Sequence, residues 1–259
     1  MRIILLSAKM SFDISKRYPV NMLFSIMSSV FSFIPYLLIV IMFSDVSDDY
    51  IAWVTVGSAI WLVLSQLIWS IGMSTKSEIE EGTLEQLIIS PANEVVVLAG
   101  KAMPSIGISL LTSITVLLVL AICSETRYFR VIEVIILLFC CVPMFVGSAI
   151  LLSILVIKFK EVAAFFQVLM TCFTILFGIA TPIQYLPYPL KVLSNILVVP
   201  QIVQYSREIF IDGRSLLEVE ILKNIAFVTT IGIVVLIVSI LLLKRMIENM
   251  KTKGSLLYV

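Results

Sequence analysis

The chain has 259 residues, of which 60% are hydrophobic and 14% charged, and its 18 basic and 17 acidic side chains leave a net charge of +1. A mean hydropathy of +1.12 excludes a water-soluble globular protein, because that much apolar surface would aggregate in water. The near-neutral net charge gives no overall basic signature, so nucleic acid is not indicated as a partner. The sequence has no histidine, which removes the commonest metal ligand and general base.

Residues 1–19 predict a helix that lies in the membrane interface. Arg2, Lys9 and Lys16 recur every seven residues, and Asp13 follows Lys9 by four. At about 100° per residue these side chains fall on one stripe of a helix, and most apolar residues lie away from it. The pattern favours a helix with its polar side toward the lipid headgroups. An unstructured tail is the alternative.

Six apolar runs follow, each long enough to cross the hydrocarbon core of a membrane as a helix. About 20 helical residues span a core of about 30 Å. We therefore predict an all-α integral membrane protein with six transmembrane helices, in which residues 1–259 form a single transmembrane domain. The runs cover residues 20–43, 50–74, 101–123, 131–157, 162–182 and 221–243.

Basic residues are unevenly shared between the two sides of these predicted spans. Most of the 18 Lys and Arg residues fall on the side that holds both termini, and the first loop on the opposite side, SDVSDD at residues 44–49, has none. Because cytoplasmic loops are enriched in Lys and Arg, we expect a multi-pass protein of the cell membrane with both termini in the cytoplasm.

The segment between the second and third spans, residues 76–100, is rich in glutamate. Four glutamates between positions 78 and 85 would cost on the order of 10 kcal/mol inside a membrane, so the segment lies in the cytoplasm. Thr83 and Gln86 form a capping-box pattern after Gly82, which predicts a short helix. This helix would dock on a partner through one apolar face, and a solvated loop is the alternative. The apolar face carries Leu84, Leu87 and Ile88.

Residues 183–220, between the fifth and sixth spans, fall on the outer side in this topology. Their longest apolar run, Val192 to Val203, is too short to cross a membrane. Prolines break the segment into short helices, so we predict outer re-entrant helices that form a gate, with a simple surface cap as the alternative. The prolines are Pro182, Pro187, Pro189 and Pro200.

Two stripes of side chains are candidates for a cargo pathway or a dimer interface. On the first span, serines recur at helical spacing, which suits close helix packing and interhelical hydrogen bonds; packing within one subunit is the alternative. On the fifth span, an aromatic stripe is suited to contact an amphipathic molecule, although lipid-facing or core phenylalanines are commoner. The residues are Ser25, Ser28, Ser29 and Ser32 on the first span, and Phe166, Phe173 and Phe177 on the fifth.

Charge is absent from the middle of every predicted span, since Glu133 and Glu161 lie at span ends. Ion-coupled carriers usually place ionisable residues there, so an uncharged path for apolar or amphipathic cargo is favoured: a drug, a peptide, a lipid or a lipid-linked glycan. The chain has no G-x-x-x-x-G-K-[ST] sequence that would bind ATP. It also has no recognisable set of nucleophile, base and orienting group, so we expect no enzymatic activity.

The stretch EEGTLEQLIISPANEVVVLAGK, residues 80–101, resembles the cytoplasmic loop of ABC-2 type permeases, the membrane subunits of type-2 ABC exporters. It shares with that loop a Gly-Thr-Leu-Glu core, then a Ser-Pro and a Gly-Lys. Six spans, an interfacial first helix and a proline-rich outer segment are also what the family shows. The matching residues are Glu81, Gly82, Thr83, Leu84, Glu85, Leu87, Ser90, Pro91, Gly100 and Lys101.

The resemblance implies the permease subunit of an ATP-driven exporter, which forms a homodimer or heterodimer and binds an ABC ATPase. That separate polypeptide would hold ATP and Mg²⁺, and this chain would bind no cofactor, metal or nucleic acid. The loop would be a coupling helix seated in a groove of the ATPase. From the residues alone, a passive channel or a sensory membrane subunit stays open as the alternative. The coupling residues implied are Glu81, Gly82, Thr83, Leu84, Glu85, Leu87 and Ile88.

Overall fold

A computed structural model describes most of the chain as helix. It covers residues 48–81, 94–123, 128–159, 163–179, 183–216 and 218–253, together with isolated helical positions between residues 20 and 34. No strand occurs among these described residues. The prediction of an all-α chain is therefore confirmed for the part that the structure describes. The predicted interfacial helix at residues 1–19 lies outside the described residues.

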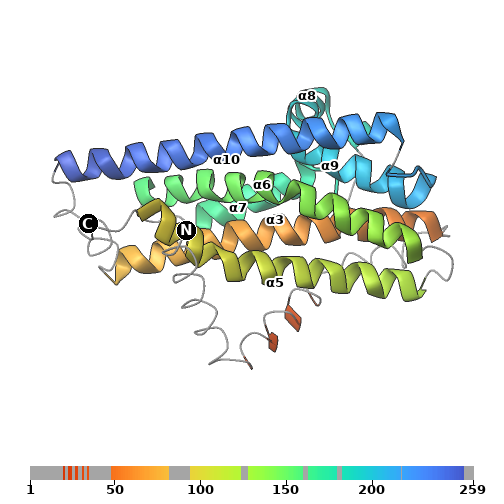
Figure 1. Ribbon diagram of the computed structural model, residues 1–259, viewed down its shortest axis with the longest axis horizontal. Coiled ribbons are helices and arrows are strands. Elements are labelled where there is room, and N and C mark those ends of the chain that lie inside the picture. Colours follow the sequence, from red (N-terminus) through yellow and green to blue (C-terminus); the bar gives the residue numbers. More distant parts are fainter. Residues whose placement is uncertain are drawn as a thin grey trace.

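Four long helices run side by side along the long axis of the molecule (Figure 1). Helices α3, α6 and α10 run in one direction along this axis, and α5 runs in the opposite direction (Figure 1). The starts of α3, α6 and α10 therefore lie together with α8 and α9 at one end, and the start of α5 lies at the other end (Figure 1). We refer to the first of these as the α9 end. The four helices are α3 (Asp48–Glu80), α5 (Glu94–Cys123), α6 (Tyr128–Phe159) and α10 (Val219–Lys253).

Within the part of the chain that the structure describes, three helices are long and apolar enough to cross a membrane: Ala52–Ser77, Arg130–Leu155 and Val219–Asn249. Two shorter apolar helical stretches, Met103–Leu118 and Phe166–Leu176, accompany them among the residues that the structure describes. Most of the predicted first span, residues 20–43, lies outside the described residues. Three helices of spanning length fit a membrane protein, whereas the arrangement with six spans stays a prediction.

Helix α3 lies at the centre of the bundle and α10 at its edge. In their most apolar segments, 72% of the α3 residues are buried inside the protein, against 50% for α6 and 22% for α10. The buried side of α3 is continuous, and it carries Val56, Ile60, Val63, Leu64, Leu67 and Ile68. Burial on this scale makes α3 the scaffold against which α5 and α6 pack.

Helix α7 (Ala163–Leu176) is shorter than the predicted fifth span at residues 162–182, so the predicted C-terminal boundary is wrong. The chain turns at Gly178, whose φ of 67° is in the left-handed region. Glycine adopts this conformation without steric cost and commonly ends helices. The Ile179 N–H bonds the Thr174 carbonyl at 3.4 Å, as it would in a helix that closes on a left-handed residue.

The predicted gate segment consists of short helices: η1 (Ile183–Tyr185), α8 (Tyr188–Ile196), α9 (Val198–Arg207) and the π-helical turn η2 (Glu208–Asp212). Prolines stand at the helix starts, where a missing N–H costs little. Pro187 is the N-cap of α8, Pro189 follows in its first turn, and Pro200 lies in the first turn of α9. Whether these helices enter a membrane from the outer side stays a prediction.

Helices α6 and α10 approach one another most closely at two glycines. A Cβ atom added to Gly147 would lie 2.8 Å from the backbone nitrogen of Leu236, and one added to Gly232 would lie 3.0 Å from the backbone nitrogen of Met144. Real Cβ atoms essentially never come closer than 3.0 Å to another heavy atom. The absence of a side chain at these positions therefore allows the two backbones to touch, and we refer to this contact as the glycine seam.

Candidate functional site

A cavity of about 660 Å³ lies between α3, α5 and α7. We refer to it as the chamber. Ser28, from the predicted first span, also lines it. The other lining residues are Leu62, Ser65, Gln66, Trp69 and Ser70 of α3, Ser105 and Ile108 of α5, and Gln167 and Met170 of α7.

Helical spacing explains why these residues meet in one place. On α3, Leu62, Gln66 and Ser70 are four residues apart, and so are Ser65 and Trp69, so each set lies along one side of the helix. On α5 and α7, the lining pairs are three residues apart, Ser105 with Ile108 and Gln167 with Met170, which also share a face. Each helix therefore contributes at least one polar and at least one apolar group to the wall.

Two side-chain hydrogen bonds join α3 to α5 at the chamber. The hydroxyl oxygens of Ser70 and Ser105 are 2.5 Å apart. The Thr112 hydroxyl lies 2.9 Å from Oε1 of Gln66 and 2.8 Å from the Ser109 carbonyl. Such bonds hold apolar helices together where lipid offers no alternative partner. They also fix the position of the Gln66 amide in the wall.

None of the described residues that line the chamber carries a charge. The predicted first span, which contributes Ser28, has no Asp, Glu, Lys or Arg between residues 20 and 43. Among the described residues, no group of three or more Cys, Asp or Glu side chains is placed to hold a metal ion. The chamber is thus suited to hold a neutral molecule through hydroxyl and amide groups.

The two stripes predicted from the sequence differ in where they lie. Ser28 lines the chamber, and the rest of its stripe, Ser25, Ser29 and Ser32, lies outside the described residues. Phe166 and Phe177 are buried. Phe177 stacks on Phe173 at 5.1 Å between ring centroids and meets the edge of Trp61 at 5.7 Å. The aromatic stripe therefore packs in the core, which was the commoner alternative for phenylalanines.

Almost all of the predicted coupling helix lies outside the described residues. Glu81 is an exposed turn residue that follows α3, and its backbone N–H bonds the Ser77 carbonyl at 2.9 Å. The remaining coupling residues, Gly82, Thr83, Leu84, Glu85, Leu87 and Ile88, lie outside the described residues. Their role stays a prediction from the resemblance.

A buried arginine at the α9 end was missed by the sequence reasoning. Arg207 is only 8% exposed. Its Nε donates to the Trp53 carbonyl at 3.2 Å, and its Nη2 donates to the carbonyls of Gly178 at 2.9 Å and Ile179 at 3.4 Å. The guanidinium carbon also lies 3.5 Å from the centroid of the Trp53 ring, a cation–π contact. A side chain at Gly57 would clash with this guanidinium.

These contacts cap the C-terminal end of α7 with side chains from α8 and α9. The Ser194 hydroxyl donates to the Leu176 carbonyl at 2.7 Å, and Arg207 donates to the carbonyls of Gly178 and Ile179, just beyond the last residue of the helix. Carbonyl groups at a helix end have no partner within the helix, and a cation is favourable there. One buried guanidinium thus joins α9 to both α3 and α7.

A second cavity, of about 350 Å³, lies beside Arg207. Its wall includes the carboxylates of Glu208 and Asp212 and the amides of Gln184 and Gln204. Burial, with a smaller contribution from the charge of Glu208, raises the pKa of the nearby Tyr205 above its ordinary value. This cavity is therefore mixed in charge, unlike the chamber.

A second arginine holds η2 to the start of α6. Arg130 Nη1 donates to the carbonyls of Phe210 at 3.1 Å and Ile211 at 3.3 Å. Glu133 Oε2 accepts from the Leu216 N–H at 3.2 Å. Since α6 carries both groups one turn apart, it anchors the loop that leads into α10. Arg130 and Glu133 both lie near the start of α6 rather than in its middle, as the sequence predicted for the charged residues of the spans.

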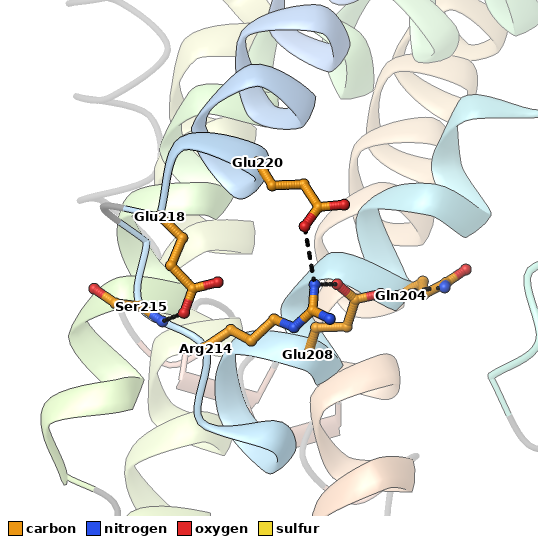
Figure 2. Close-up of polar contacts among 6 residues, drawn as sticks. All are labelled: Gln204, Glu208, Arg214, Ser215, Glu218 and Glu220. Carbon is orange, nitrogen blue, oxygen red and sulfur yellow. Dashed lines mark hydrogen bonds and ion pairs between the residues drawn. The ribbon is translucent and has the colours of Figure 1, made fainter.

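Surface charges complete this end of the molecule (Figure 2). Arg214 reaches Glu208 at 3.6 Å and Glu220 at 3.7 Å. Glu208 also accepts from the Gln204 amide at 3.2 Å, and Glu218 accepts from the Ser215 N–H at 3.2 Å. Surface pairs of this kind contribute about 0–1 kcal/mol each, so the buried Arg207 and the half-buried Arg130 hold the α9 end more firmly than these do.

The polarity pattern gave no signal for Arg207, because an arginine in a predicted outer loop is ordinarily solvated. Gln66 and Trp69 were overlooked because each is a single residue in an apolar run. No protein-family model and no curated protein sequence matches the chain, so the residues and their geometry carry the functional inference.

Proposed function

We propose that this chain is the permease subunit of an ATP-driven exporter that moves an uncharged amphipathic cargo across the cell membrane. The observation that supports this most is the chamber, an open-sided cavity between apolar helices whose described lining residues are uncharged and include serines and glutamines beside apolar side chains. The cargo would pass along α3, α5 and α7, and the glycine seam between α6 and α10 would support the wall.

Polar side chains in the chamber wall cost folding free energy, and a protein that only had to fold in a membrane would gain nothing from them. A polar group without a hydrogen bond in an apolar environment costs about 1–3 kcal/mol in proteins. Gln167 is exposed on α7. Thr171, one turn later, is exposed too, but its hydroxyl already bonds the Gln167 carbonyl at 2.9 Å. Hydroxyl and amide groups at such depth are tolerated where they line a cavity or face another protein surface. A pathway makes use of them, whereas a purely structural bundle has no need of them.

A second copy of the chain, or a related permease, would cover the exposed face of α7. In this arrangement the partner closes the open side of the chamber, and Ser28 of the first span would lie at or near the dimer interface. A homodimer or a heterodimer would thus place protein, rather than lipid, against the polar groups on the exposed face of α7.

ATP hydrolysis would occur in a separate ATPase subunit. The resemblance of residues 80–101 to the loop of ABC-2 type permeases supports this, as does the absence of a phosphate-binding loop from the sequence. Leu84 and Leu87 would fill an apolar groove of the ATPase, while Glu81 and Glu85 lie at the rim. The alternative is a passive channel or a sensory subunit, which would need no ATPase.

The test is reconstitution with a candidate ABC ATPase, in lipid nanodiscs and in vesicles. We expect a stable complex whose ATP hydrolysis rises with cargo and whose transport stops when the ATPase is inactivated. Leu87→Asp should abolish both at normal membrane levels, because a buried apolar anchor contributes about 2 kcal/mol or more. Glu85→Gln, the matched rim substitution, should retain most of the activity.

Two results would contradict the proposal. Cargo flux that is independent of ATP would identify a passive channel. Normal ATPase association and export in both Leu84→Ala and Leu87→Asp would show that the loop is merely solvated and that the resemblance misidentifies its role.

A further inference from the structure

The hydrogen-bonding groups of the chamber wall determine what the chamber can bind. Three serines and a glutamine belong to α3 and α5: Ser65, Gln66, Ser70 and Ser105. Within the Ser70–Ser105 pair, one hydroxyl donates to the other, so the O–H of the accepting serine and lone pairs on both oxygens stay available. Gln167 adds an amide from α7. The Ser65 hydroxyl already donates to the Leu62 carbonyl at 3.3 Å, and Oε1 of Gln66 already accepts from Thr112 at 2.9 Å, so these two oxygens offer a ligand only their remaining lone pairs. The wall therefore presents both donors and acceptors.

A charged ligand does not fit this wall. The described lining residues supply no opposite charge, and an ion loses its hydration when it enters an apolar helix bundle. A purely apolar ligand does not fit either. It would displace water from hydroxyl and amide groups and leave them without partners, which is the basis on which polar sites reject apolar analogues.

Trp69 supplies the third feature of the wall. Its side chain is 44% exposed, and it lines the chamber one turn from Ser65 and beside Ser70. A flat indole next to hydroxyl and amide groups matches a molecule with an apolar C–H face and a polar edge. Leu62, Ile108 and Met170 add an apolar wall for a tail.

We propose that the chamber binds the uncharged, hydroxyl-rich headgroup of an amphipathic molecule, a sugar or a closely related polyol, with its C–H face against Trp69. That this molecule is transported rests on the proposed function, whereas its binding to the chamber does not. This chemistry distinguishes the ligand from neutral peptides, whose amide groups are usually matched by exposed backbone rather than by serine hydroxyls.

The test measures binding to the chain alone, without any ATPase. The chain has three tryptophans: Trp53 stacks with Arg207 and Trp61 contacts Phe177. Trp53→Phe with Trp61→Phe therefore leaves Trp69 as the only fluorescent indole. In nanodiscs, this variant would be titrated with three probes that share an octyl tail: octyl glucoside, octyl glucuronide and octanol. An octyl-capped neutral dipeptide is the fourth probe. Equilibrium dialysis of radiolabelled octyl glucoside with the unmodified chain repeats the measurement without substitutions.

We expect octyl glucoside to change the Trp69 fluorescence with an affinity at least about tenfold higher than that of the other three probes. Gln66→Leu and Gln167→Leu should each weaken octyl glucoside binding about fivefold or more. The helix contact should survive Gln66→Leu, because the Thr112 hydroxyl still has the Ser109 carbonyl as its acceptor. Gln201→Leu is the matched control, since Gln201 bonds the Asn195 carbonyl away from the chamber, and it should change the affinity less than about twofold.

Equal binding of octyl glucoside and octanol would overturn the proposal, because the tail alone would then account for it. Tighter binding of the glucuronide or of the dipeptide would overturn it in favour of those classes, and so would an unchanged affinity in both glutamine variants. Each of these results leaves ATP coupling untouched. Conversely, failure to associate with an ATPase would refute the proposed function without affecting sugar binding.

Discussion

The glycine seam and the chamber are two contacts between helices of similar composition, and they serve opposite purposes. At the seam, Gly147 and Gly232 let the backbones of α6 and α10 touch, which leaves no space for a ligand. At the chamber, Ser70 and Ser105 join α3 to α5 through side chains and a cavity of about 660 Å³ stays beside them. Removing side chains produces a rigid wall, whereas short polar side chains produce an interior that can bind a neutral molecule.

The largest effect should follow from filling the seam. Gly147→Leu places a side chain against the backbone of Leu236, so the helices must separate or the chain must fail to fold, at a cost of about 3 kcal/mol or more. Yield of folded protein and the midpoint of thermal unfolding in detergent are the measurements. Gly107→Leu is the matched control, because a Cβ atom there has open space around it. Equal loss of stability in both variants would mean that the seam is not specially tight.

The next largest effect should follow from removing the charge at the α9 end. Arg207→Met leaves the carbonyls of Trp53, Gly178 and Ile179 without this donor, which we expect to cost about 3 kcal/mol. Arg214→Met, the matched exposed arginine, should cost less than about 1 kcal/mol. Denaturant titration of the two variants compares them directly. The comparison tests whether a buried arginine with several hydrogen bonds contributes more stability than an exposed arginine whose partners water can replace. Similar losses of stability in the two variants would show that it does not.

The smallest effect on stability should come from the chamber. Ser105→Ala removes one interhelical hydrogen bond, which is worth about 0.6 kcal/mol on average in membrane proteins. Ser148→Ala, whose hydroxyl bonds only the Met144 carbonyl in its own helix, is the control. If the comparison is right, the seam variant loses stability, while Ser105→Ala stays folded and loses binding of the neutral probe. If Ser105→Ala lost as much stability as Gly147→Leu, the chamber would be a structural contact like the seam, and the contrast between the two would be wrong.

The sequence predicted the helical class well because that information is local. Apolar runs of spanning length and prolines at segment starts act through the nearest few residues, and the described helices α3, α6 and α10 fall close to predicted runs. The end of the fifth run was wrong because one residue, Gly178, turned the chain before the apolar composition changed. Apolar composition predicts which residues can lie in a membrane. It does not predict the residue at which the backbone dihedral angles leave the helical range.

The site was predicted only in part, for a related reason. Ser28 emerged from a helical stripe of serines, and it lines the chamber. Phe166 and Phe177 also formed a stripe, yet they are buried in the core. A stripe identifies the residues that share a face, and the partner of that face depends on how the helices pack.

By itself, the sequence predicted a helical chain with apolar runs long enough to span a membrane, which holds for the described residues and for the helices α3, α6 and α10, since both features follow from short-range composition and periodicity. Only the tertiary structure decided that Ser70 meets Ser105, that Gln66 meets Thr112 and that Arg207 is buried against Trp53, because these pairs are 35, 46 and 154 residues apart. Contacts at such separations depend on the packing of whole helices, and no local pattern of residues encodes them.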